Sequence, residues 1–79
     1  MAFPTTDKEW ADRTSRFFKA QLKKADLTYD ELAERIAKHG YSETKSSITN
    51  KLARGTFPAP FFLAALAAMG CETIRLDDV

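Results

Sequence analysis

The sequence predicts an all-α domain of four helices, followed by one short β-strand. Apolar residues recur at spacings of three and four along most of the chain, capping residues precede these stretches, and glycines end them. The 79 residues suffice for one small core, because so short a chain buries only about 60% of the surface that it exposes when unfolded. We therefore expect a single domain over residues 5–79.

Composition and charge exclude several classes of protein. Hydrophobic residues make up 44% and charged residues 29% of the chain, which is typical of a folded domain rather than a disordered one. Twelve Lys and Arg against eleven Asp and Glu leave a net charge of +1, so the total charge names no partner. A single cysteine cannot close an intrachain disulfide, and no apolar run approaches the roughly 20 residues that cross a bilayer. We expect a cytoplasmic protein without membrane contact.

A first helix is predicted from near Thr6. Thr6 and Glu9 have the spacing of a capping box, in which each side chain bonds to the backbone of the other residue. An apolar stripe follows and is expected to face the core: Ala11, Thr14, Phe18, Leu22 and Ala25, with Trp10 and Phe17 on its flank. The opposite side carries the chain's basic stripe, which consists of Arg13, Arg16, Lys19, Lys23 and Lys24.

The second and fourth helices are predicted from strong apolar patterns between clear end signals. The second begins with a capping box at Thr28 and stops at Gly40, where glycine suits a left-handed cap. The fourth has Pro58 or Pro60 in its first turn, where a missing amide does no harm, and it ends at Gly70. Because nearly all of its residues are apolar, the fourth helix is expected to be the most buried.

The third helix, over about residues 45–54, is predicted to be short and mostly polar. Ser42 or Thr44 can cap it, and Gly55 ends it. Its strong apolar residues are Ile48 and Leu52, which are four apart and define the buried direction.

The outward face of this helix is typical of a helix that reads DNA. Asn can bond an adenine edge, Arg a guanine edge, and Ser or Thr either, while Lys can hold phosphates. We assign a nucleic-acid site to seven residues, of which the two lysines are expected to hold phosphates: Lys45, Ser46, Ser47, Thr49, Asn50, Lys51 and Arg54. The same composition is also found in helices that are weakly packed and merely face solvent.

A short strand is predicted over residues 72–77, because polar and apolar residues alternate there with Ile74 and Leu76 on one side. A strand without a partner leaves its amides unpaired, so we expect it to pair with a second copy of the chain in a homodimer. Alternatively, the segment is extended and packs only on its own domain.

The sequence does not indicate an enzyme active site. His39 follows the second helix, where a cationic side chain suits the negative end of the helix dipole, and Cys71 is expected to be a buried thiol. The sequence contains no zinc-binding spacing, phosphate-binding glycine loop or Ser/His/Asp set. We expect neither an enzyme nor a bound metal or cofactor.

The order of these parts resembles the lambda-repressor-like helix-turn-helix pattern of the Xre/Cro type, through residues 27–36, 46–55 and 58–70. From about residue 8 to 76, the chain also resembles an uncharacterised bacterial family, domain of unknown function 6471. That resemblance rests on Asn50-Lys51, Arg54-Gly55, Phe57 and the aromatic-rich last helix. It implies that fold but no assigned activity. This chain departs from the repressor pattern in its connection over residues 38–45, which is longer than the usual tight turn.

Two functions follow from these observations. The first is a dimeric transcriptional regulator that binds double-stranded DNA through the third helix. The second is a protein interaction or oligomerisation module on the same helical scaffold, without DNA binding, which the nearly neutral total charge favours.

Overall fold

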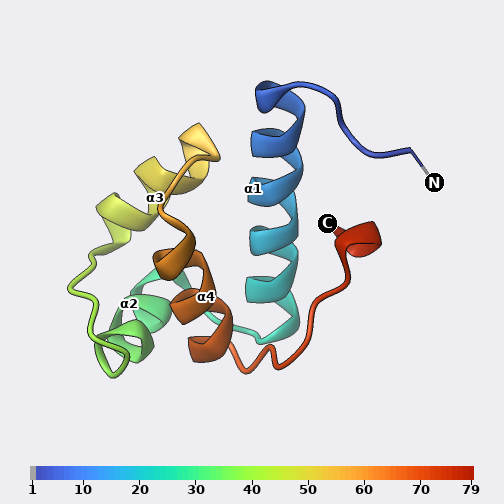
Figure 1. Ribbon diagram of the computed structural model, residues 1–79. Helices are drawn as coiled ribbons and strands as arrows, with labels where there is room; N and C mark the ends of the chain where they lie inside the picture. The colour runs from blue at the N-terminus through green and yellow to red at the C-terminus, as the bar shows by residue number, and fades with distance from the viewer. Residues whose placement is uncertain (1) are drawn as a thin grey trace.

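The computed structural model describes residues 2–79, which form four α-helices and a final 3-10 turn. The helices are α1 (Asp7–Lys24), α2 (Tyr29–Ala37), α3 (Lys45–Arg54) and α4 (Ala59–Ala68), and the turn spans Leu76–Asp78. In Figure 1, α1 stands beside a group of the three shorter helices, and the C-terminal segment returns along the other side of α1. The predicted all-helical class with four helices is confirmed.

Capping residues start the first three helices. The Thr6 hydroxyl accepts a hydrogen bond from the Glu9 amide at 3.2 Å, and Thr28 and Glu31 form both bonds of a capping box. The backbone amide of Thr28, followed by its hydroxyl, stabilises the carboxylate of Glu31 and lowers the pKa of that side chain. At α3 the cap is Thr44 rather than Ser42. These bonds satisfy amides that a helix leaves without partners.

The helix ends also follow the sequence. Gly40 has φ of 90°, and the Tyr41 amide bonds back to the Ile36 carbonyl at 3.3 Å, so the predicted left-handed cap of α2 is confirmed. Helix α4 follows Pro58 and has Pro60 in its first turn. Among residues 2–79, no helix has the length and apolar character needed to span a membrane.

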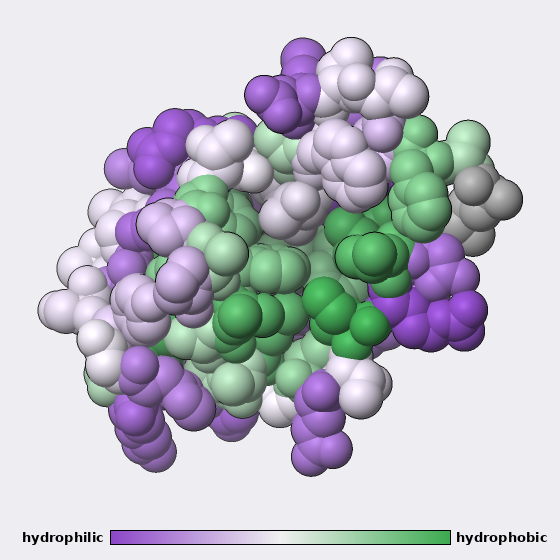
Figure 2. All heavy atoms as spheres, viewed as in Figure 1, coloured by the Kyte–Doolittle hydropathy of each residue, from purple (hydrophilic) through white to green (hydrophobic). Residues whose placement is uncertain are grey.

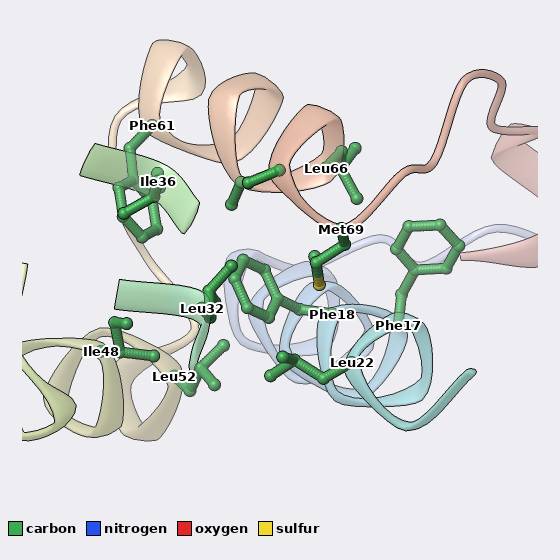
Figure 3. Packing of buried hydrophobic residues seen from close by; sticks show 12 residues of the cluster. Phe17, Phe18, Leu22, Leu32, Ile36, Ile48, Leu52, Phe61, Leu66 and Met69 are labelled. Carbon is green, nitrogen blue, oxygen red and sulfur yellow. The ribbon is translucent and has the colours of Figure 1, made fainter. Parts of the chain in front are cut away.

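The core lies where all four helices meet, and Phe18 of α1 is at its centre. Its ring stacks on Phe61 at a centroid distance of 6.3 Å and meets the edge of Phe57 at 5.8 Å. Leu32 and Ile36 of α2 are fully buried, and Figure 3 shows Leu32 directed toward Phe18 and Ile36 beside Phe61. The predicted burial of Phe18 and Leu22 on one stripe of α1 is confirmed.

Two residues of α1 are buried that were not placed on the inward stripe. Phe17 is only 7% exposed, because the C-terminal segment lies over that side of α1 and the Phe62 ring packs beside it. Ser15 is 8% exposed because it faces α3. The buried surface of α1 is therefore wider than the predicted stripe.

The strand predicted for residues 72–77 is wrong. Residues 71–75 run without ladder hydrogen bonds, and the chain then closes a 3-10 turn in which the Asp78 amide bonds to the Arg75 carbonyl at 3.0 Å. The segment packs on its own domain instead, since Val79 contacts the core and Ile74 lies near α1. The homodimer expected through this strand therefore loses its structural basis.

Candidate nucleic-acid interface

Helix α3 is attached to the domain along one side and exposed along the other. Ile48 is fully buried and Leu52 is 3% exposed, as predicted. On the opposite side, Ser46, Asn50 and Arg54 are all exposed. In Figure 2, white and purple side chains predominate over α3, whereas green, hydrophobic ones gather over α4. The exposed strip of α3 can therefore reach a partner without any change in packing.

Lys45 and Thr49 extend this strip toward the start of the helix. Both side chains are exposed. The Thr49 hydroxyl donates to the Lys45 carbonyl at 2.8 Å, which fixes its rotamer and leaves its oxygen able to accept a hydrogen bond. We refer to the five exposed residues as the α3 strip: Lys45, Ser46, Thr49, Asn50 and Arg54.

The other two predicted site residues, Ser47 and Lys51, are bound to Glu43. The Glu43 side chain is only 8% exposed and accepts from Lys51 Nζ at 3.0 and 3.1 Å. The Ser47 hydroxyl lies 2.6 Å from Glu43 Oε1 and accepts from the Thr44 amide. Lys51 Nζ also lies 5.0 Å from the centroid of the Phe61 ring. These contacts fix the α2–α3 connection to α3 and use the charge that a phosphate would need.

We expect Lys51→Met to lower the free energy of unfolding by about 1–3 kcal/mol, because it leaves the Glu43 carboxylate largely buried without its cation. Urea denaturation followed by circular dichroism measures this loss. Glu43→Gln combined with Lys51→Met removes both charges and should restore at least half of it. Equal stabilities of the single and double variants would contradict this role of the pair.

Two contacts set the position of α3 against α1. The Ser15 hydroxyl donates to the Leu52 carbonyl at 2.7 Å in a buried site. Gly55 has φ of 68° and lies against the backbone of Ala11, so closely that a Cβ built on it would be 2.8 Å from the Ala11 carbonyl carbon. The glycine both ends α3 and lets the two helices approach.

This approach brings part of the basic stripe of α1 beside α3. Arg16 and Lys19 line a shallow groove together with Leu52, Ala53 and Gly55 at the end of α3. Both basic side chains are exposed. Sequence reasoning found the stripe but not its neighbour, because no local pattern states which helix packs beside it. Ser15 did carry a signal: it lies four residues after Ala11 and three before Phe18, at the edge of the inward stripe.

Within residues 2–79, the His, Cys, Asp and Glu side chains do not form a metal-binding cluster, because no group of three or more of them could hold a metal ion. His39 is exposed, and Cys71 is half-buried, with its thiol 3.3 Å from the Thr73 carbonyl oxygen. Neither His39 nor Cys71 belongs to the α3 strip.

Fold and surface together define a small all-helical domain that presents a polar helix flanked by basic residues. Residues 10–74, most of the chain, match the model of a protein family described as Domain of unknown function (DUF6471). The chain belongs to this family, and the resemblance to this family seen in the sequence is confirmed. No curated protein and no solved structure matches the chain.

Proposed function

We propose that the protein is a DNA-binding transcriptional regulator of the helix-turn-helix type, with α3 as its recognition helix. The observation that carries this proposal is the α3 strip, because short hydrogen-bonding side chains and an arginine are exposed on a helix whose other side is firmly anchored. An α-helix fits the major groove, where base edges differ in their donors and acceptors. The α2–α3 pair is the proposed helix-turn-helix unit.

Individual roles follow from side-chain chemistry. Asn50 can donate to and accept from an adenine edge, and Arg54 can bond a guanine edge with two donors. Ser46 and Thr49 are placed for further contacts with bases or phosphates, and Lys45 for a phosphate. Ser47 and Lys51 receive no DNA contact in this proposal, because Glu43 holds both of them.

The basic stripe of α1 supplies further phosphate contacts. Arg16 and Lys19 lie beside the C-terminal end of α3, and neither side chain forms an ion pair within residues 2–79. A duplex that contacts Arg54 would bring its backbone close to them. Each phosphate neutralised should make binding more sensitive to salt.

Asn50→Ala should weaken binding to the preferred duplex by about 1–3 kcal/mol if the side chain bonds a base edge. The duplex is first selected from a random pool, and affinity is measured by fluorescence anisotropy. Lys45→Ala should instead weaken binding to all sequences and reduce the salt slope by about one. Lys38→Ala, at the far end of α2, removes a matched charge outside the α3 strip and should change neither.

Salt separates this function from the alternative, an interaction module that binds another protein. DNA binding should fall with salt at a logarithmic slope of about 0.9 per phosphate contacted, whereas an apolar protein interface should respond little. The proposal is overturned if the random pool yields no preferred DNA sequence and Asn50→Ala binds duplex DNA as tightly as the unchanged protein.

A further inference from the structure

A groove of about 630 Å³ lies between α1 and the C-terminal segment. Figure 1 shows α3 and this segment on opposite sides of α1, so the groove is separate from the α3 strip. Four of the side chains that line it are basic: Arg13, Arg16 and Lys24 from α1, and Arg75 from the C-terminal segment.

The groove carries an excess of positive charge. Asp78 is its one acidic side chain, and within residues 2–79 it forms no ion pair. The side chains of Arg13, Arg16 and Lys24 have no hydrogen-bond or ion-pair partner within residues 2–79. Arg75 forms an ion pair with Asp77 at 2.9 Å, and the Arg75 side chain is 75% exposed. The three α1 residues fall within an arc of about 80° on the helix, so their charges point into one region. Like charges held together in this way favour an anion.

The other lining residues restrict the anion to a small, partly polar molecule. Gln21 and Thr73 offer hydrogen-bonding groups, while Phe17 and Ala20 form an apolar floor. Arginine presents paired donors that match the oxygens of a phosphate. The volume lies in the range of small-molecule sites.

We propose that this groove binds a small organic phosphate with two or more negative charges, such as a nucleoside diphosphate. The phosphates contact Arg13, Arg16 and Arg75, and the uncharged part of the molecule lies on the floor near Phe17. Phosphates of a nucleic-acid backbone share this chemistry, but a duplex docked on the α3 strip would lie across α1 from most of the groove. The site therefore uses none of the α3 strip and shares only Arg16 with the proposed DNA contacts.

NMR titration of the full chain with inorganic pyrophosphate and with ADP tests the site. We expect saturable shifts at the amides of Gln21, Thr73 and Arg75. Arg13→Gln should weaken binding about tenfold or more, since a charge-assisted hydrogen bond of that strength is lost. The control is Lys23→Gln, which removes the same charge from α1 outside the groove and should change affinity less than about twofold.

Two further variants complete the test. Arg16→Gln, at an exposed position, repeats the test if Arg13→Gln perturbs folding. Asn50→Ala should leave pyrophosphate binding unchanged, so the site stands or fails independently of DNA binding. The proposal is overturned by non-saturable shifts, by an equal loss in Lys23→Gln, or by groove shifts that a mixed-sequence duplex causes and the small phosphates do not.

Discussion

Phe18→Ala is expected to lower the free energy of unfolding by about 3–5 kcal/mol. The Phe18 side chain is fully buried, and its ring packs against three other phenylalanines, Phe57, Phe61 and Phe62. Removing it deletes apolar contacts and leaves a cavity that these large rings cannot fill without moving. A domain of this size has a total stability on the order of 4–12 kcal/mol, so this one change should unfold a measurable fraction of the protein.

Urea denaturation monitored by circular dichroism measures the effect. Leu63→Ala is a suitable control, because this α4 side chain is 62% exposed and its loss should change stability by less than about 0.5 kcal/mol. If Phe18→Ala and Leu63→Ala were equally stable, the core would not be centred on Phe18.

Gly55→Ala is expected to cost about 2–5 kcal/mol of stability, from two separate sources. An L-residue in the left-handed region loses roughly 1–2 kcal/mol, and φ at this position is 68°. The added methyl would also collide with the backbone of Ala11, which cannot rotate away as a flexible side chain could. Forcing α1 and α3 apart should add about 1–3 kcal/mol through loss of close packing.

Gly70→Ala isolates the first source, the backbone strain. Gly70 has φ of 79°, yet a Cβ there would meet no atom within 4 Å, so only the backbone strain should appear. Thermal and urea unfolding of the two variants give the difference between them. A loss in Gly55→Ala no larger than that in Gly70→Ala would show that the contact with Ala11 has no energetic role.

Helix positions could be predicted from the sequence because the determining interactions are local. A capping threonine and the amide that it accepts from are three residues apart, as at Thr28 and Thr44, and the glycines that end helices act on their own backbone. The buried pair Ile48 and Leu52 was also readable, since four residues return to the same side of a helix. The exposed side of α3 followed from this pair.

The interactions that set the limits of the site are not local. Lys51 contacts Glu43 from eight residues away, across the start of α3, and Ser15 reaches Leu52 from 37 residues away. Nothing in the residue types distinguishes Lys51, which holds a buried carboxylate, from Lys45, which is exposed. The assignment of phosphate contacts therefore required tertiary structure.

The C-terminal segment shows how a local pattern can mislead. Alternation around Ile74 and Leu76 is typical of a strand, but a strand needs a partner edge, and residues 2–79 provide none. The chain instead turns at Leu76, whose side chain is 67% exposed, and places Val79 against the core.

The hydrogen bond from Ser15 to the Leu52 carbonyl determines whether the proposed DNA-binding helices could be moved to another protein. Leu52 is among the last residues of α3, whose carbonyls have no acceptor role left inside the helix, and α1 supplies the missing donor. An excised α2–α3 peptide would lack that donor together with the surface that covers Ile48 and Leu52. The helical pair is thus not a portable module: its final turn is completed by a residue that the ribosome makes thirty-seven positions earlier.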